Sequence, residues 1–322
     1  MRRGRATDDA GPDGVLVVHK PAGPTSHDIV GLVRRLAGTR RIGHGGTLDP
    51  FASGVLPLFL GAATRLAEYH LGRDKRYRAT VCFGASSTTD DLEGELTRAG
   101  KAPDQAAVEA ALAGFRGTIE QRPPDFSAVK IGGRRAYAMA RAGITPELRP
   151  RTVTIQALEL LSWDATDADR PIGTIDLSCS AGTYVRSLAR DLGAATGSAA
   201  YLGSLVRTWS GSFGLEDAVS VETIREAATR SGAAGVAGLL RPVDAGLEWM
   251  ARATVSKEEI PRLLQGQAVR PADASPGQDE EPVRVTDVAG RLLAIGSIRD
   301  GQVAPRKVLV RPPADAREAA DA

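Results

Sequence analysis

Two segments of the chain alternate apolar and polar residues, and this pattern constrains the fold more than any other feature of the sequence. In residues 77–83 the apolar positions are Tyr77, Ala79, Val81 and Phe83. In residues 174–179 they are Ile175, Leu177 and Cys179. Because successive side chains of a β-strand point to opposite faces, each segment predicts a strand with one buried face. A short apolar run over residues 14–18 predicts a further buried strand.

Helical patterns stand beside these strands. Thr25 and Asp28 have the spacing of a capping box, and the apolar residues that follow have helical spacing: Ile29, Leu32, Val33 and Leu36. Gly38 predicts the end of this helix. Two further helices are predicted over residues 108–115 and 185–192, where apolar residues recur on one face.

Composition changes near residue 250, and the segment after it predicts a second, β-rich domain of about 60 residues. A short helical pattern covers residues 257–265, and two apolar runs, 283–288 and 292–298, flank a turn at Ala289-Gly290. A last apolar run covers residues 308–310. We predict a disordered leader (1–13), a large domain (14–250), a small β-rich domain (251–312) and a disordered tail (313–322).

Charge is unevenly distributed along the chain, although the net charge of the 322 residues is only +2. Residues 1–80 carry 13 Lys and Arg against 7 Asp and Glu. A basic region of this kind is typical of a phosphate-binding face, but a solvated surface explains it equally well. Charge alone therefore leaves both interpretations open.

The N-terminus, the cysteines and the histidines narrow the class of protein. The first residues are charged, and no apolar run is long enough to span a membrane, so we expect a cytoplasmic protein with no membrane partner. Cys82 and Cys179 lie in strand-like segments, and neither has a metal-ligand spacing with any of the four histidines. We therefore expect buried, reduced thiols and no metal site.

The segment GHGGTLDP, residues 43–50, is the strongest candidate for a functional site. Its three glycines allow unusual backbone angles and the close approach of a ligand. Pro50 restricts Asp49 to an extended conformation, so a single carboxylate is held on a rigid loop near His44. Taken alone, such a loop is more often a structural turn, because Asp-Pro with nearby glycines is a common turn signal.

Five motifs, in this order along the chain, resemble those of the TruB-type pseudouridine synthases. Residues 43–50 resemble the family's active-site loop. The other motifs are 18–26 with Lys-Pro-x-Gly, 54–57 with 61–65, 74–77 with Lys-x-Tyr, and 179–186 with Gly-Thr-Tyr-x-Arg. The set covers most of residues 14–210, which makes it far more specific than any one motif.

The resemblance implies both a fold and a reaction. The fold is α+β, a mixed, mainly antiparallel central sheet flanked by helices, with a small β-rich PUA-like RNA-binding domain at the C-terminus. The reaction is the isomerisation of uridine to pseudouridine at position 55 in the T-loop of tRNA, without a cofactor. Asp49 is then the catalytic carboxylate, and Arg186 is the cation that lowers its pKa and keeps it ionised. Tyr77 is either a stacking platform for the flipped uracil or a core residue.

The resemblance also places further residues at the RNA. His44 would fill the space that the flipped uridine leaves. Lys20 would support the catalytic loop or bind a backbone phosphate. Tyr184 belongs to the Gly-Thr-Tyr-x-Arg motif and is expected in the binding site. Leu205 either lines the uracil pocket or packs in the core.

Three charged segments complete the prediction. The basic segment 125–145 contains Arg134 and Arg135, which we expect to clamp the tRNA. Asp90 and Asp91 lie in an acidic, turn-like segment that we interpret as structural. An acidic insert at residues 279–281 does not suit a phosphate-contacting surface, so the share of RNA affinity supplied by the C-terminal domain is open.

Two alternatives to a free-standing enzyme arise from the same residues. The chain could be a tRNA-folding chaperone with a relic pocket, although a buried carboxylate without a task is costly. It could also be an RNA-guided synthase within a larger particle, but it lacks the long basic extensions expected there. We therefore expect a monomer that acts on tRNA without a guide RNA.

Overall fold

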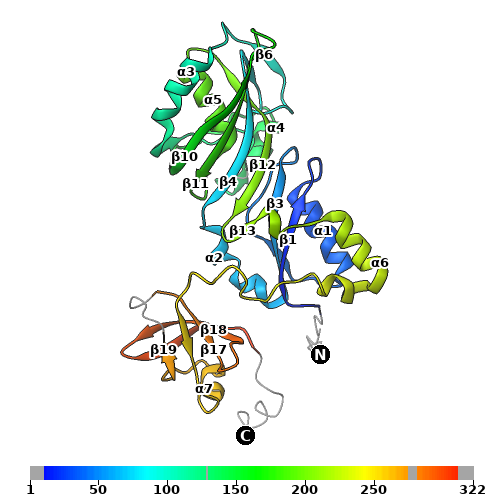
Figure 1. The fold of residues 1–322 in the computed structure, drawn as a ribbon, viewed down its shortest axis with the longest axis vertical. Coiled ribbons are helices and arrows are strands. Elements are labelled where there is room, and N and C mark those ends of the chain that lie inside the picture. Colours follow the sequence, from blue (N-terminus) through cyan, green and yellow to red (C-terminus); the bar gives the residue numbers. More distant parts are fainter. Residues whose placement is uncertain (1–10, 128–129, 275–280, 311–322) are drawn as a thin grey trace.

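A ten-stranded mixed sheet forms the centre of the structure, a computed structural model that describes residues 11–127, 130–274 and 281–310 (Figure 1). Its strands are β1 (Gly14–Lys20), β2 (Ile42–His44), β3 (Ser53–Leu60), β4 (Lys75–Phe83), β7 (Gly117–Gln121), β10 (Arg151–Asp164), β11 (Ile172–Cys179), β12 (Ala200–Ser210), β13 (Phe213–Gly214) and β14 (Val219–Ser220). Their order is β14-β1-β3-β12-β4-β11-β10-β7, with β2 beside β3 and β13 beside β12. The β1–β14 and β3–β12 pairs are parallel, and the other pairs in this sheet are antiparallel. The mixed, mainly antiparallel sheet is confirmed.

Helices pack against this sheet through one continuous apolar cluster. They are α1 (Ser26–Leu36), α3 (Gln105–Leu112), α5 (Val185–Ala195) and α6 (Val221–Ala237). Figure 1 shows α3 and α5 near one end of the sheet, and α1 and α6 near the other. Short helical turns connect the strands: η1 (Gly61–Leu66), α2 (Glu68–Leu71), η2 (Ala113–Phe115) and η3 (Leu215–Asp217).

The local patterns predicted the main elements of this part of the chain. The strand predicted over residues 77–83 is β4, and the one over 174–179 is β11. Thr25 caps α1: its side chain accepts a hydrogen bond from the backbone of Asp28, whose carboxylate accepts one from the backbone of Thr25. The helix ends just before Gly38, which has φ +64°. The apolar spacing and the cap chemistry therefore agree with the tertiary packing.

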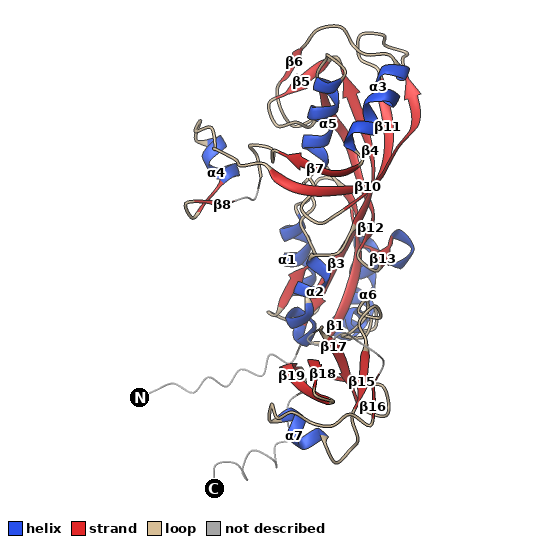
Figure 2. Ribbon diagram, turned by 90° about the vertical axis from the view of Figure 1, so that its left-hand side faces the viewer, coloured by secondary structure: helices blue, strands red, loops and turns tan. Residues whose placement is uncertain are grey.

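A small extension projects from the sheet between β7 and β10 (Figure 2). It contains β8 (Lys130–Ile131), β9 (Arg134–Arg135) and α4 (Ala136–Arg141). The two strands pair antiparallel, with Ile131 opposite Arg134. The side chains of Arg134 and Arg135 lie outside what the structure describes, so their predicted contact with tRNA stays a prediction. A second hairpin, β5 (Ala85–Ser87) with β6 (Leu96–Arg98), follows β4.

The C-terminal segment forms a separate five-stranded sheet at one end of the elongated molecule (Figure 2). It contains β15 (Arg252–Thr254), β16 (Asp273–Ala274), β17 (Val283–Thr286), β18 (Leu292–Arg299) and β19 (Gln302–Val308), with the short helix α7 (Ile260–Leu264). These elements bury an apolar cluster of their own. The predicted small β-rich unit is therefore present, whereas the domain boundaries stay a prediction. Residues 1–10 of the predicted leader and the whole predicted tail, 313–322, lie outside the described residues, as do residues 311 and 312.

The last strand differs from the sequence pattern. The final apolar run covers residues 308–310, but β19 begins at Gln302. A tight turn at Asp300 and Gly301, with φ of 51° and 70°, sends the chain back along β18. Pro305 concealed this strand, because proline cannot donate to a ladder and is confined to positions such as an edge strand. In the order of this sheet β19 is an edge strand, which makes Pro305 compatible with it.

Candidate active site

The loop between β2 and β3 holds Asp49 on a rigid backbone. Ser26, at the start of α1, pins the preceding residue: its hydroxyl accepts a hydrogen bond from Leu48 N at 2.8 Å and donates one to Leu48 O at 3.0 Å. Gly46 has φ +122°, a conformation that few residues other than glycine adopt. The Asp49 side chain itself stays 34% exposed. The loop therefore offers one fixed carboxylate that a ligand can still reach.

Arg186, in the first turn of α5, holds that carboxylate with two nitrogens. Its Nε lies 3.0 Å from Oδ2 of Asp49, and its Nη2 donates to Oδ1 at 3.2 Å. This two-point contact fixes the orientation of the carboxylate as well as its charge. The structure thus brings together the two residues that the resemblance pairs.

Arg186 also holds two other segments of the chain. Its Nη1 lies 3.3 Å from Oδ2 of Asp91 and donates to Thr89 O at 3.2 Å. Its Nη2 donates in addition to Phe126 O at 3.0 Å. One buried guanidinium therefore joins the catalytic loop to the two loops that flank it.

The pKa of Asp49 departs from the expectation. The sequence predicts that Arg186 lowers it, and Arg186 does so, but burial acts more strongly in the opposite direction. The nearby negative charge of Asp91 adds to the effect of burial. The net result is that the pKa of Asp49 lies above its ordinary value. Raised carboxylate pKa values of this kind are concentrated at functional sites.

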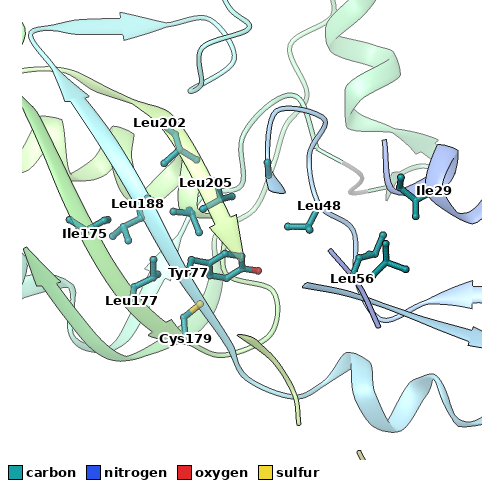
Figure 3. Close-up of a cluster of buried hydrophobic side chains, with 14 of the residues drawn as sticks. Ile29, Leu48, Leu56, Tyr77, Ile175, Leu177, Cys179, Leu188, Leu202 and Leu205 are labelled. Carbon is teal, nitrogen blue, oxygen red and sulfur yellow. The ribbon is translucent and has the colours of Figure 1, made fainter. Parts of the chain in front are cut away.

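Tyr77 and Leu205 form an apolar wall beside the loop. Both are at least nine-tenths buried and belong to the main apolar cluster. Figure 3 shows the Tyr77 ring beside Leu205, with its hydroxyl pointing toward the loop that carries Leu48. Burial raises the pKa of Tyr77, which keeps the hydroxyl protonated. Core packing and a role in the site are thus compatible for Tyr77, and for Leu205 both interpretations stay open.

His44 and Lys20 support the loop from its two ends. The His44 Nδ1 accepts a hydrogen bond from Gly46 N at 3.3 Å, and burial lowers the pKa of its imidazole. Lys20 is fully buried, and its ammonium donates to the carbonyls of Pro21, Pro50 and Ala52 at 2.9, 3.1 and 2.7 Å. A fully buried ammonium cannot meet a backbone phosphate without a rearrangement. Of the two roles expected for Lys20, the structure favours support of the loop.

Tyr184 directly precedes α5 and is held by a neighbouring strand. Tyr184 N donates to Oε1 of Gln121 at 2.8 Å, and Nε2 of Gln121 donates to Tyr184 O at 3.0 Å. This reciprocal pair fixes the start of the helix that carries Arg186. Tyr184 therefore lies next to the site, as the motif implies.

Comparison with known proteins agrees with this geometry. Residues 34–185 match the model of the TruB family pseudouridylate synthase (N terminal domain), and residues 251–309 match that of pseudouridine synthase II TruB, C-terminal. The chain is 40% identical over 299 residues to the tRNA pseudouridine synthase B of Acaryochloris marina, covering 92% of this chain and 98% of the relative. It is 48% identical over 258 residues to that of Symbiobacterium thermophilum, covering 80% and 83%. The chain belongs to the TruB family of pseudouridylate synthases.

Two solved structures share the fold. One is an H/ACA RNP bound to a substrate RNA containing 2'-deoxyuridine, with a TM-score of 0.71, 22% identity, and coverage of 98% of this chain and 94% of that one. The other is a Cbf5-Nop10-Gar1 complex, with a TM-score of 0.71, 25% identity, and coverage of 96% and 92%. The α+β architecture with a small C-terminal sheet is thus shared with these solved structures.

Sequence analysis missed the placement of Asp91. Asp90 fits the structural interpretation, because its Oδ2 pairs with Arg190 at 2.9 Å. Asp91 instead turns inward to Arg186, and its side chain is only 3% exposed. Two adjacent acids in a turn give no local signal of which one meets the site. The distance of 95 positions between Asp91 and Arg186 hides the contact from any local pattern.

Among the described residues, no three His, Cys, Asp or Glu side chains are grouped closely enough to hold a metal ion. The helices of the described segments are all too short or too polar to cross a membrane.

Proposed function

We propose that this chain isomerises uridine to pseudouridine at position 55 in the T-loop of tRNA, with Asp49 as the catalytic carboxylate. The observation that carries the proposal is the two-point contact of Arg186 with a carboxylate that remains 34% exposed. The similarity to proteins named tRNA pseudouridine synthase B supports tRNA as the substrate. The pair is buried on the arginine side, whereas the aspartate stays open to a ligand.

The chemistry needs no cofactor because it is an internal rearrangement. The bond between N1 of uracil and C1′ of the ribose breaks, the base rotates, and a bond forms between C5 and C1′. The C5 proton leaves and N1, released from the sugar, takes up a proton, so atoms and electrons balance. Asp49 can serve as nucleophile toward the sugar, as nucleophile toward the base, or as base for the C2′ proton, and it must be ionised for each. Arg186 offsets the burial that opposes ionisation.

The walls of the site suit an extruded base. Stacking of a base on an aromatic ring such as Tyr77 contributes about 1–3 kcal/mol. Extruding a nucleotide from a stacked loop costs a few kcal/mol, so one aromatic wall offsets much of it. Burial lowers the pKa of the His44 imidazole and so keeps the ring neutral. A neutral ring is suited to fill the gap that the flipped base leaves in the RNA, rather than to bind a phosphate.

We further propose that the protein acts on tRNA as a monomer without a guide RNA. The basic balance of residues 1–80 supplies charge for the phosphates. The C-terminal sheet is the second expected RNA contact, and the acidic insert at residues 279–281 is expected to limit its contribution. The catalytic loop and the residues that hold it all belong to the ten-stranded part of the chain.

The proposal is tested by incubating purified protein with an unmodified tRNA transcript and no cofactor, followed by CMC-based or mass-spectrometric mapping. Pseudouridine at position 55 is expected, and its complete loss in Asp49→Asn with unchanged tRNA affinity. Tight binding of tRNA without any product would contradict the proposal and favour a folding chaperone. Pseudouridine at another position would support the proposed reaction and contradict position 55 as its target.

A further inference from the structure

A second buried arginine lies beneath the catalytic loop. Arg207, on β12, is 1% exposed. Its Nε donates to Val55 O at 2.7 Å, its Nη2 to Gly46 O at 3.1 Å, and its Nη1 to Thr47 O at 3.4 Å. Arg207 is also opposite Tyr77 in the pairing of β12 with β4, and its charge acts on the Tyr77 phenol. One residue therefore contacts the loop before Asp49 and the strand after it, and lies beside the aromatic wall.

This arginine differs from an ordinary buried cation. Within the described part of the chain, no carboxylate lies at ion-pair distance from Arg207, and its hydrogen bonds there go to main-chain carbonyls. Burying a guanidinium without a counter-charge is unfavourable, and the hydrogen bonds to carbonyls offset the cost only if the geometry is held closely. Its five N–H donors in a rigid fork suit a contact with several carbonyls at once. The buried charge of Arg207 is therefore stabilised only while the loop keeps the conformation that presents these carbonyls.

The backbone of Arg207 is fixed where the two halves of the central sheet join. Strands β3 and β12 pair at only two positions, Val206 with Ser53 and Arg207 with Gly54. The contact is so close that a Cβ atom on Gly54 would lie 2.2 Å from Arg207 O. On its other side, Arg207 is opposite Tyr77 in the pairing of β12 with β4. Arg207 is therefore the point at which the loop and the Tyr77 strand are held in register.

Lys20 performs the complementary task on the far side of Asp49. Arg207 binds the carbonyls of Gly46 and Thr47, which precede Asp49, and Lys20 binds those of Pro50 and Ala52, which follow it. Asp49 is thus held between two buried cations whose hydrogen bonds go to backbone carbonyls. Of these two, Arg207 is the one that also lies opposite Tyr77, on the other wall of the site.

We propose that Arg207 is a positioning residue, which sets the distance between the Asp49 carboxylate and the Tyr77 ring across the uracil. The proposal rests on the proposed function, because that distance matters only if a base is bound between the two. Arg207 itself does not touch the substrate. Misplacement of a reacting group by about 1 Å costs on the order of 100-fold in rate.

Single-turnover formation of pseudouridine, with enzyme in excess over tRNA, tests this proposal. Arg207→Met is expected to slow the reaction by about 100-fold, with the Kd for tRNA unchanged. Arg207→Lys keeps the buried charge but has fewer, less rigid donors, so an intermediate rate is expected. Hydrogen exchange of the amides in residues 43–50 should accelerate in both variants, and this readout does not depend on activity.

Arg116→Met is the matched control. Arg116 also uses its guanidinium on a main-chain carbonyl, because its Nε and Nη2 donate to Leu158 O at 3.1 and 2.8 Å, outside the catalytic loop. It should keep its single-turnover rate and its exchange in residues 43–50. Arg207 variants with a wild-type rate and wild-type exchange would overturn the proposal. So would a loss of rate that Arg116→Met reproduces. An inactive wild-type protein would reject the proposed function, while the exchange experiment would still decide whether Arg207 orders the loop.

Discussion

The catalytic loop, residues 43–50, and the acidic turn, residues 87–95, are similar in composition, but their aspartates differ in exposure. Both combine glycine, threonine and acidic residues, and both are typical of turns. Both also place one aspartate on Arg186, at 3.0 Å for Asp49 and 3.3 Å for Asp91. They differ in exposure: the side chain of Asp49 is 34% exposed and that of Asp91 is 3% exposed.

This difference separates two tasks. A carboxylate that a ligand can reach is suited to chemistry, and one that is closed off is suited to holding its cation. The Asp91 carboxylate accepts hydrogen bonds from the Thr89 hydroxyl and from Glu93 N, which leaves it little freedom to turn away. The comparison teaches that one arginine can be held by a buried acid while its second acid stays open to a ligand.

The largest effect is expected from substitution of Asp49, the exposed aspartate of the pair. Asp49→Asn keeps the shape of the side chain and removes its charge, so the single-turnover rate should fall by about 10³–10⁴-fold or more. The affinity for tRNA, measured by filter binding, should not change. A variant that keeps a tenth of the rate would show that Asp49 is not the catalytic group.

A smaller effect is expected from substitution of Asp91, the buried aspartate of the pair. Asp91→Asn leaves Arg186 with one charged partner in place of two, and the arginine can then shift away from Asp49. We expect the single-turnover rate to fall by about 10–100-fold without a change in tRNA affinity. Asp90→Asn is the matched control, because Asp90 pairs with Arg190 instead, and its rate should stay close to wild type.

A shift in pH dependence sharpens the comparison. Burial and the negative charge of Asp91 both hold the pKa of Asp49 above its ordinary value. The rate should therefore decline on the acid side as Asp49 takes up a proton. Removal of the Asp91 charge lowers the pKa of Asp49, so the acid limb of Asp91→Asn should move to lower pH. A limb that stays in place or moves to higher pH would contradict the shared electrostatics of the two loops.

The smallest effect concerns stability. Because the pKa of Asp49 is raised in the folded state, the folded protein binds this proton more tightly than the unfolded chain does. Ionised Asp49 therefore lowers the free energy of unfolding at pH values above its folded pKa, and the penalty fades as the pH falls toward the ordinary value of 3.8. Asp49→Asn should melt at a higher temperature than wild type at pH 7 and at an equal temperature near pH 4. A lower melting temperature at pH 7 would show that the ion pair outweighs the burial.

The sequence was most informative where local chemistry decides the structure. The alternation in β4 and β11 and the capping box of α1 fix their elements without help from the rest of the chain. The start of β19 at Gln302 was missed. Pro305 is compatible with a strand at the edge of a sheet, and no local pattern shows that the turn at Asp300 leads into such an edge strand. Strand order could not be derived from periodicity, and the family resemblance implied only a mixed, mainly antiparallel sheet.

The same division applies to the site. Glycines, proline and histidine within eight residues of Asp49 made it a candidate, and the family resemblance then assigned it the catalytic role and paired it with Arg186. Asp91, Gln121 and Arg207 were missed because each acts across a gap of more than 60 positions: on Arg186, Tyr184 and the catalytic loop, respectively. Residues that hold a site are chosen by the fold, and no local pattern marks them.

The most direct test of the account is the release of tritium from C5 of labelled uridine in a tRNA transcript, followed in single turnover for wild type, Asp49→Asn, Asp91→Asn and Asp90→Asn. The account predicts full release by wild type, none by Asp49→Asn, slow release by Asp91→Asn, and nearly normal release by Asp90→Asn. Release by Asp49→Asn, or equal rates for Asp91→Asn and Asp90→Asn, would contradict it.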